Sequence, residues 1–292
     1  RYMLNKGVER MLCWMNGHYV ESQALRISPF DHGFLYGLGF FETFRTYDGH
    51  VPFFENHYNR LSEALRHFHI EMPYTILDFE EVIKTLNKEA EGDGYFRLNV
   101  SAGVHDIGLQ QTIYNEPTII VFRKPLIERP RGKEKEAIWL KIPRNTAEGM
   151  MRFKSHHYGN NVLARFEVPN LADYEGFFLT ETDFIAEGIT SNIFWVKDDI
   201  LYTPSLETGI LGGITRKQVI HLAKNLGFIV KEGMYKAAEL EQAAECFVTN
   251  AVQELVPIYK IGDNMFEGAA GQVYTKLHQA YVDEILQRIK GE

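Results

Sequence analysis

Residues 186–195 read AEGITSNIFW and residues 202–216 read YTPSLETGILGGITR, and the fold is decided by these two stretches. The second leads into a run, 214–226, whose apolar residues share one face of a helix. Gly212 and Gly213 stand directly before that helix, where free backbone N–H groups attract a phosphate and glycine lets it approach closely. A Gly-Gly turn before a helix is usually only a turn. By itself it is therefore weak evidence for a phosphate site.

Glu187, Lys154 and Arg152 can each be interpreted either as an ordinary surface residue or as a residue with a chemical role. Glu187 follows a predicted strand and is by default a solvated turn carboxylate, but it could also keep a pyridine nitrogen protonated, which makes that ring a better electron sink. Lys154 is by default a surface lysine, but a lysine that attacks an aldehyde must lose its charge and needs a desolvated or cationic setting. Arg152 would share a face with Lys154 in an extended chain and could supply that setting or bind a substrate carboxylate. An exposed arginine is an equally good interpretation of Arg152.

Further from these stretches, local patterns predict a mixture of helices and strands. Asn16-Gly17 between LCWM and HYVE predicts a hairpin. Apolar periodicity predicts helices over 55–70, 78–90, 214–226 and 272–289, and strands at 95–101, 117–122, 137–142, 176–180, 192–196, 200–203 and 245–250. The fold class is therefore α/β or α+β.

A change in composition divides the chain. Residues 123–136, RKPLIERPRGKEKE, contain two prolines, a glycine and many charges, which is typical of a solvated interdomain linker. We therefore predict an N-terminal α/β domain over 12–122 and a C-terminal domain over 137–292. An anion-binding patch is the less favoured interpretation of the basic residues in the linker.

Composition excludes several classes of protein. The 292 residues carry a net charge of -8, which argues against nucleic acid as the main partner. No apolar run approaches the ~18 residues of a membrane-spanning helix, and the first residues lack the layout of a signal peptide. Cys13 and Cys246 fit neither a disulfide framework nor a zinc site, and the adjacent His156 and His157 would point apart in a strand, so no metal is expected. A cytoplasmic protein without membrane or nucleic-acid partners is expected.

The two opening stretches resemble a known signature. The run Glu187–Phe194, then Thr203, then Leu211–Arg216 resembles the signature of the class IV aminotransferase family, which are the fold-type IV enzymes that use pyridoxal 5'-phosphate (PLP). The resemblance extends from about Leu12 to the C-terminus. It implies a smaller N-terminal α/β domain, a larger barrel-like C-terminal domain, PLP as cofactor and a homodimer.

The resemblance also implies roles for individual residues. Lys154 is similar to the lysine that binds the cofactor covalently, and Glu187 to the partner of its pyridine nitrogen. The residues that match contacts of the cofactor phosphate are Arg60 in HYNRL, Ile214 and Thr215 at the predicted helix start, and Asn250 and Ala251 in VTNAVQE.

Within the family, two segments favour one activity. Residues 28–45 and 154–165 resemble the Gram-positive type of aminodeoxychorismate lyase, which forms pyruvate and 4-aminobenzoate for folate synthesis. Phe41 and Ala102 stand where D-amino acid aminotransferases carry a tyrosine and an arginine of their carboxylate trap, while Leu38 replaces an aspartate that is common among relatives.

The substrate of such a lyase has two carboxylates, so its pocket should contain cationic groups. The candidates are Arg45, Arg97, Arg152 and His105. The main alternative activity is a D-amino acid or branched-chain aminotransferase, which would share every cofactor residue. A non-catalytic protein that kept the fold is a more distant alternative, against which the presence of Lys154 and Glu187 argues.

Overall fold

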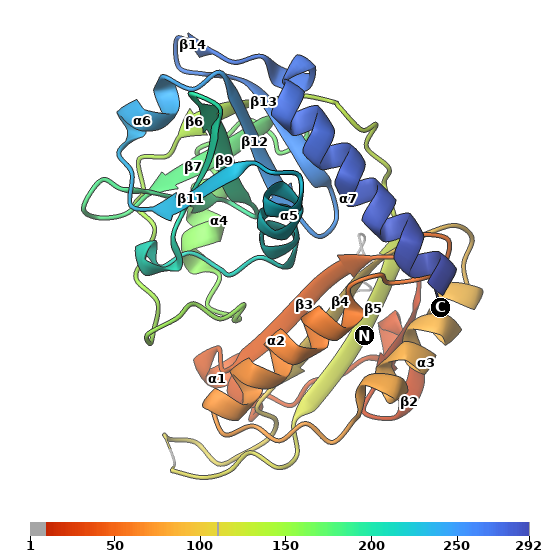
Figure 1. Ribbon diagram of the computed structural model, residues 1–292. Helices are drawn as coiled ribbons and strands as arrows, with labels where there is room; N and C mark the ends of the chain where they lie inside the picture. The colour runs from red at the N-terminus through yellow and green to blue at the C-terminus, as the bar shows by residue number, and fades with distance from the viewer. Residues whose placement is uncertain (1–9, 110, 292) are drawn as a thin grey trace. The chain divides into compact units, whose positions relative to one another are not determined.

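The computed structural model describes residues 10–109 and 111–291, and the chain divides into two compact units (Figure 1). Unit 1 is the chain up to Ile127 together with Lys154–His157, and unit 2 is Glu128–Phe153 together with the chain from Tyr158 onward. The boundary at Ile127 falls inside the predicted linker 123–136. The return of Lys154–His157 to unit 1 was not predicted, because it depends on pairing with a strand far away in the sequence.

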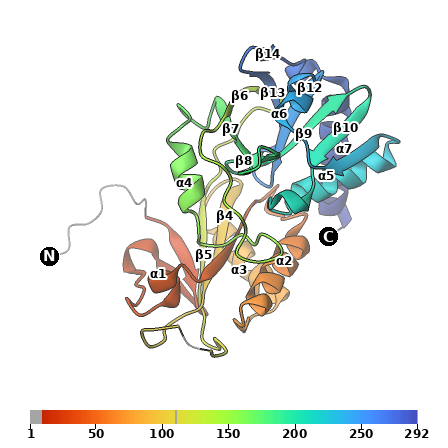
Figure 2. The same ribbon diagram turned by 90° about the vertical axis from the view of Figure 1, so that its left-hand side faces the viewer.

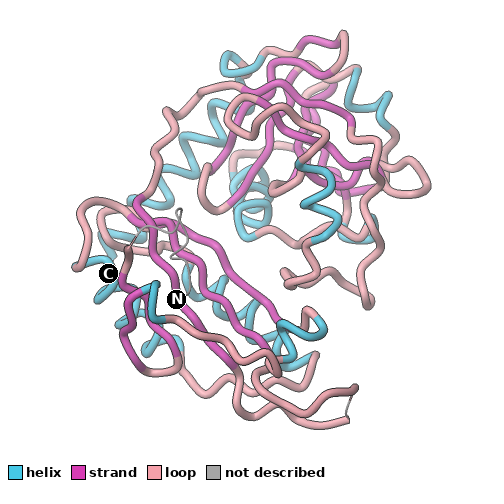
Figure 3. Tube along the Cα trace, turned by 180° about the vertical axis from the view of Figure 1, so that it is seen from behind, coloured by secondary structure: helices cyan, strands magenta, loops and turns pink. Residues whose placement is uncertain are grey.

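Unit 1 is built on a five-stranded sheet of order β2-β1-β5-β4-β3, in which all neighbours are antiparallel. Its magenta strands lie side by side in Figure 3. The strands are β1 (Leu12–Met15), β2 (His18–Glu21), β3 (Gly39–Arg45), β4 (Gly94–Ser101) and β5 (Thr118–Pro125). The predicted hairpin joins β1 to β2. Its turn residues Asn16 and Gly17 have φ of 43° and 91°, the left-handed values that an Asn-Gly turn supplies.

Helices α2 and α3 cover one face of this sheet. The helices of unit 1 are α1 (His32–Tyr36), α2 (Phe54–His67) and α3 (Ile76–Lys88), with a short 3-10 turn η1 (Ser22–Ala24). Helix α2 packs along β3, and α3 packs on β1 and β5 (Figure 1). Alternation along β3 directs Phe40, Glu42 and Phe44 to the helical face and Phe41 to the other face.

Lys154–His157 extends the sheet at its β3 edge. The N–H of Phe41 donates to the carbonyl of Lys154 at 2.9 Å, and the N–H of His156 donates to the carbonyl of Gly39 at 2.9 Å. Phe40 and Ser155 form the antiparallel bridge between these two bonds. Residues opposite each other in such a pair share a face, so Lys154 lies on the Phe41 side of the sheet.

Unit 2 contains a curled nine-stranded sheet of order β11-β10-β9-β12-β13-β6-β7-β8, with β14 paired to β13. Strand β8, at one end of this order, packs back against β9 and β10, which confirms the predicted barrel-like domain. The strands are β6 (Lys135–Trp139), β7 (Tyr174–Leu179), β8 (Ile185–Gly188), β9 (Asn192–Lys197), β10 (Ile200–Pro204), β11 (Ile229–Gly233), β12 (Glu245–Asn250), β13 (Glu254–Ile261) and β14 (Asn264–Met265).

The two longest helices of unit 2 lie side by side against the sheet. Helices α5 and α7 pack on each other and on β12 (Figures 1 and 2). Gly227 follows α5 with φ of 82°, as expected of a glycine past a helix C-terminus. The helical segments are α4 (Gly159–Arg165), α5 (Ile214–Asn225), α6 (Ala237–Glu241) and α7 (Gln272–Gly291), with 3-10 turns η2 (Leu206–Thr208) and η3 (Gly268–Ala270).

The predicted linker is shorter and less solvated than its composition indicates. Strand β5 runs to Pro125 and β6 begins at Lys135, so only 126–134 separate them. Within the segment, Arg123 and Lys135 are buried, and Arg131 forms two hydrogen bonds of 2.8 Å with Glu254. The two basic residues at the ends of the segment, Arg123 and Lys135, are therefore packed into the units, while Lys124, Arg131 and Lys133 between them are exposed.

In the described residues, we find no helix with the length and apolar character needed to cross a membrane. The first nine residues, where the sequence predicted the absence of a signal peptide, lie outside the described part of the chain.

Candidate active site

In unit 1, Lys154 and Arg97 contact the same aromatic ring. The Nζ atom of Lys154 lies 4.5 Å from the ring centroid of Phe41, and the Cζ atom of Arg97 lies 3.6 Å from it. Arg97 is on β4, and its Nε donates to Asn99 Oδ1 at 3.1 Å. Arg97 is therefore the second cationic side chain at the aromatic ring that Lys154 contacts. The sequence had offered Arg152 for this role and did not indicate Arg97.

Next to this group, Glu42 holds Arg60 and His57 on the helical side of β3. Arg60 Nε and Nη2 donate to the two Glu42 oxygens at 2.8 and 2.6 Å, and His57 Nδ1 lies 2.7 Å from Glu42 Oε2. Burial alone would raise the pKa of Glu42, but the charge of Arg60 and the bonds from His57 outweigh it and lower this pKa to about 2. Burial lowers the pKa of His57. Glu42 is therefore an ionised anchor that orients Arg60.

His156 lies against the same ring as Lys154. Its imidazole stacks on Phe41 at a centroid distance of 6.2 Å, and burial together with the charge of Arg97 lowers its pKa to about 4. A Cβ atom at Gly39 would lie 2.3 Å from His156 Nδ1, so the ring occupies the space that only glycine leaves. His157 instead contacts Gly37. The described residues contain no group of three or more His, Cys, Asp or Glu side chains arranged for a metal ion.

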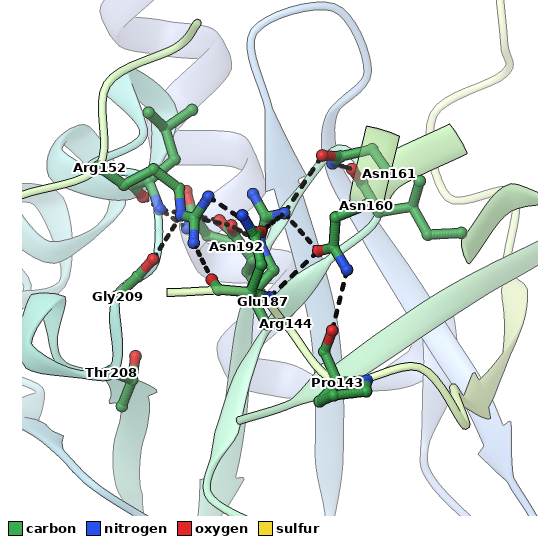
Figure 4. Close-up of polar contacts among 12 residues, drawn as sticks. Pro143, Arg144, Arg152, Asn160, Asn161, Glu187, Asn192, Thr208 and Gly209 are labelled. Atoms are coloured by element: carbon green, nitrogen blue, oxygen red, sulfur yellow. Dashed lines mark hydrogen bonds and ion pairs between the residues drawn. The ribbon is translucent and has the colours of Figure 1, made fainter. Parts of the chain in front are cut away.

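In unit 2, Glu187 is a buried carboxylate at the end of β8 (Figure 4). Its Oε1 accepts from Arg144 Nε at 2.8 Å, and its Oε2 accepts from the backbone N–H of Leu211 at 2.9 Å. A carboxylate has about four acceptor directions, so these two bonds leave Glu187 able to accept another N–H. The solvated-turn interpretation of Glu187 is wrong.

Arg144 supports Glu187 and has its own fixed partners. Its Nη1 donates to the side-chain oxygens of Asn145, Asn160 and Asn161 at 3.1, 2.7 and 3.2 Å (Figure 4). The asparagines hold the guanidinium in one plane against Glu187, and the sequence had given no signal for this role.

Arg152 is buried in the same region, with its side chain 7% exposed, so the exposed interpretation is wrong. Its Nε donates to the carbonyl of Gly209 at 2.5 Å and lies 3.9 Å from Glu187 Oε1, while Nη2 donates to the carbonyl of Asn145 (Figure 4). These bonds tie the segment before Lys154 to the turn before α5.

The start of α5 is open to an anion. Its N-cap residue is Gly213, and no described side chain caps this end. A Cβ atom at Gly213 would lie 2.0 Å from Asn192 Oδ1, so the residue must be glycine. Ile214 and Thr215 form the first turn, and the Thr215 hydroxyl lies 3.4 Å from that of Tyr281.

Thr249 has a buried hydroxyl that the sequence analysis did not identify, and it lies on the same face of the unit 2 sheet as Asn192. Thr249 on β12 is paired with Asn192 on β9, so the two side chains share a face. The Asn192 side chain reaches the α5 start by donating to the Leu211 carbonyl at 2.9 Å. Thr249 is 1% exposed, and its Oγ1 has no hydrogen-bond partner among the described residues. A buried hydroxyl without a hydrogen-bond partner, close to a helix N-terminus without a side-chain cap, is consistent with a phosphate site.

The loop after β12 is shaped by Asn250. Its Oδ1 accepts from the backbone N–H groups of Val252 and Gln253 at 3.0 and 2.7 Å. Ala251 lies inside this turn. The loop is thus fixed by side-chain bonds at the end of the strand that carries Thr249.

The remaining substrate candidates lie in different parts of unit 1. Arg45 stacks on Tyr47 at 4.3 Å and lies 3.9 Å from Asp93. His105 packs on Tyr114 with a centroid distance of 4.6 Å, and its buried Nε2 has no hydrogen-bond partner among the described residues. Of the candidates within unit 1, only Arg97 shares an aromatic contact with Lys154.

Comparison with known families gives one match that spans most of the chain. Residues 39–261 match the model of the family described as amino-transferase class IV. This range includes the segments that carry Lys154, Glu187, Arg60 and the α5 start.

Individual relatives carry more than one activity. The chain is 42% identical to the aminodeoxychorismate lyase of Bacillus subtilis over 95% of this chain and 96% of that protein. It is 26% identical to a D-alanine aminotransferase of Staphylococcus epidermidis over 92% of this chain and 95% of that protein. A branched-chain amino acid aminotransferase of T.th., solved in complex with N-(5'-phosphopyridoxyl)-L-glutamate, superposes with a TM-score of 0.86 at 26% identity, covering 97% of this chain and 96% of that one.

Proposed function

The chain belongs to the amino-transferase class IV family, and we propose that it is a PLP-dependent aminodeoxychorismate lyase that releases pyruvate and 4-aminobenzoate. The observation that carries this proposal is the 42% identity with the Bacillus subtilis lyase over nearly the full length of both chains. Folate synthesis in the cytoplasm is the corresponding setting.

The residues of this chain suit PLP. The uncapped α5 start and the unmet Thr249 hydroxyl suit a phosphate, and the spare acceptor capacity of Glu187 suits a protonated pyridine nitrogen. We assign the covalent bond to Lys154 and the ring nitrogen to Glu187. The proposed phosphate contacts are Arg60, Ile214, Thr215, Asn250 and Ala251.

When bound, PLP supplies an electron sink for the charge left on carbon after proton removal. Lys154, whose amine contacts the same Phe41 ring as Arg97, would move that proton once its amine is free. Glu187, held by Arg144, would keep the proton on the ring nitrogen. The ring C–O bond would then break, the released enolpyruvate would take up a proton and become pyruvate, and the ring would become aromatic, which makes the elimination strongly downhill.

Arg97 is our first choice for a substrate carboxylate. It shares the Phe41 ring with Lys154, whereas Arg45 is occupied by Asp93 and Tyr47. The bonds of Arg152 to two backbone carbonyls favour a supporting role for it. His105 keeps an unmet buried nitrogen and is the second choice.

We also propose a homodimer. Unit 1 exposes several large apolar side chains around α1 and the loop after β4, which are Phe34, Val104, Ile107, Leu109 and Ile113. Apolar groups that gather at the surface in this way are typical of an interface between chains. Sedimentation velocity would test the proposal, and a monomer at micromolar concentration would contradict it.

The experiment that tests the activity supplies the purified protein with PLP and enzymatically generated aminodeoxychorismate, and follows 4-aminobenzoate and pyruvate. We expect equal amounts of both, and a loss of at least ~10³-fold for Lys154→Ala with an unchanged circular dichroism spectrum. Near-wild-type activity in that variant would contradict the role of Lys154.

The alternative is an aminotransferase, which the likeness to the Staphylococcus epidermidis D-alanine aminotransferase favours. It predicts that the protein converts D-alanine or a branched-chain amino acid to its keto acid and forms no 4-aminobenzoate. That outcome would retain the cofactor assignment and replace the substrate.

A further inference from the structure

Unit 2 contains a buried ion pair that the chemistry proposed above does not use. Lys135 on β6 is 2% exposed and Glu175 on β7 is 1% exposed, and Lys135 Nζ lies 3.4 Å from Glu175 Oε2. Burial lowers the pKa of Lys135 and raises the pKa of Glu175, in each case against the attraction of the partner. A buried ion pair often contributes little net stability, because desolvation offsets the attraction, so the contacts that this pair makes with neighbouring segments matter.

At one end, the pair supports the turn that carries Glu187. Glu175 Oε1 accepts from the backbone N–H of Ile189 at 3.1 Å. A Cβ atom at Gly188 would lie 2.9 Å from the same oxygen, so Glu175 packs directly beneath the residue that follows Glu187. A shift of this carboxylate would therefore move the Glu187 backbone.

At the other end, the pair supports the loop after β12. Lys135 Nζ donates to Gln253 Oε1 at 3.4 Å, and the same oxygen accepts from Asn250 Nδ2 at 3.2 Å. Asn250 in turn accepts the N–H of Gln253. The lysine therefore reaches the loop that we assign to the cofactor phosphate.

We infer that Lys135 and Glu175 form a buried brace that fixes the Asn250–Gln253 loop relative to the Glu187–Ile189 turn. The inference rests on the proposed function, since it concerns the two segments of unit 2 assigned to the phosphate and to the ring nitrogen. A ligand that binds both segments gains affinity from their fixed separation, because the second contact then costs little additional ordering. A ligand that binds only one segment gains nothing from it.

The test compares three probes that cannot form a covalent bond with Lys154. Pyridoxine 5'-phosphate reaches both segments, pyridoxine reaches only the ring site, and inorganic phosphate reaches only the phosphate site. Their dissociation constants would be measured by calorimetry on the full chain after hydroxylamine has removed bound cofactor. The variant is Lys135→Met with Glu175→Gln, which removes both charges, keeps both shapes and keeps an acceptor for Ile189.

We expect this double variant to bind pyridoxine and inorganic phosphate as the wild type does, and pyridoxine 5'-phosphate at least ~10-fold more weakly. The matched control is Lys133→Met with Asp173→Asn. Lys133 and Asp173 form a half-exposed ion pair 3.1 Å apart, and each stands two positions before a member of the brace in the sequence. It should leave all three constants unchanged.

A second variant keeps the inference testable if the double variant does not fold. Gln253→Ala breaks the loop end of the brace and leaves the ion pair intact, and it should give the same pattern with a smaller loss. Unchanged binding of all three probes would overturn the brace, as would weaker binding of inorganic phosphate or pyridoxine alone, which would indicate local damage. A wild-type protein that does not bind pyridoxine 5'-phosphate would overturn the proposed cofactor itself.

Discussion

Glu42 and Arg60 in unit 1 can be compared with Glu187 and Arg144 in unit 2, because the two ion pairs differ in which member has more partners. In unit 1 the carboxylate has the more complete set of partners, because Glu42 accepts from Arg60 and His57 and is 1% exposed, while the Arg60 side chain is 17% exposed. In unit 2 the arginine has the more complete set, because Arg144 donates to Glu187 and to three asparagines. Glu187 accepts only two hydrogen bonds in the described structure.

The difference suggests which member of each pair orients the other. A glutamate that is saturated with donors orients an arginine, which then presents cationic donors. An arginine that is held by several acceptors orients a glutamate, which then presents an acceptor. On the proposed assignments, the same two residue types would bind a phosphate in one unit and a protonated nitrogen in the other.

The largest expected effect separates the two glutamates by turnover. Glu187→Gln keeps the size of the side chain but removes its negative charge, so it should lower kcat by about 10²–10³-fold at saturating PLP. Glu42→Gln should raise the PLP concentration needed for half-maximal activity, and it should leave kcat at saturating PLP within about tenfold of wild type. The measurement is 4-aminobenzoate formation on protein whose folded fraction is verified by circular dichroism. Equal losses of kcat in the two variants would contradict the reversal of roles.

The next effect concerns stability at low pH in unit 1. The pKa of Glu42 is lowered from 4.5 to about 2, so its ionised form stabilises the folded chain above the unfolded value. This contribution, about 3 kcal/mol, is complete above pH ~4.5 and is lost as the pH falls toward 2. The difference in unfolding free energy between wild type and Glu42→Gln should shrink over that window, as urea denaturation at pH 5 and pH 3 would measure. A constant difference would show that the carboxylate is not held ionised by its partners.

These pairs also show the limits of prediction from sequence. Local periodicity was sufficient for the hairpin at Asn16, for α5 and for α7, because each depends on neighbouring residues. Lys154 and Glu187 were proposed from the family resemblance, and only Glu187 lies within the local signature that carries it. Glu42 and Arg144 were missed, because the partners that define their roles, Arg60 and Glu187, lie 18 and 43 residues away and become neighbours only in the folded units.

The one local signal for Glu42 was a charge inside the apolar run FFETF, which requires a buried partner. The pairing of Lys154–His157 with β3 had no local signal, since the two segments are separated by α2, α3 and three further strands. Long-range pairing of this kind explains why the predicted domain boundary at 137 did not anticipate the return to unit 1.

A smaller effect sharpens the comparison between the two arginines. Arg60→Met should weaken the binding of pyridoxine 5'-phosphate about 10- to 100-fold, because a charged hydrogen bond is worth about 1.5–3 kcal/mol. It should leave the binding of pyridoxine unchanged. Arg144→Met should weaken the binding of both probes by the same factor, because Arg144 acts through Glu187, which we assign to the ring nitrogen. Calorimetric dissociation constants would check both variants. Loss of pyridoxine binding in the Arg60 variant would contradict its assignment to the phosphate.

The smallest effect concerns Thr249, whose buried hydroxyl has no partner among the described residues. Thr249→Val keeps the shape and removes the unmet group, so the chain without cofactor should be as stable as wild type or up to about 1 kcal/mol more stable. If the hydroxyl donates to the phosphate, the same variant should bind pyridoxine 5'-phosphate about 10-fold more weakly, the low end of the range for one hydrogen bond to a charged group. Thr43→Val, a partly exposed threonine on β3, serves as the control for the substitution itself. Weaker phosphate binding together with equal or higher stability would mark Thr249 as a ligand, because a hydroxyl with only a structural role would lower stability when removed.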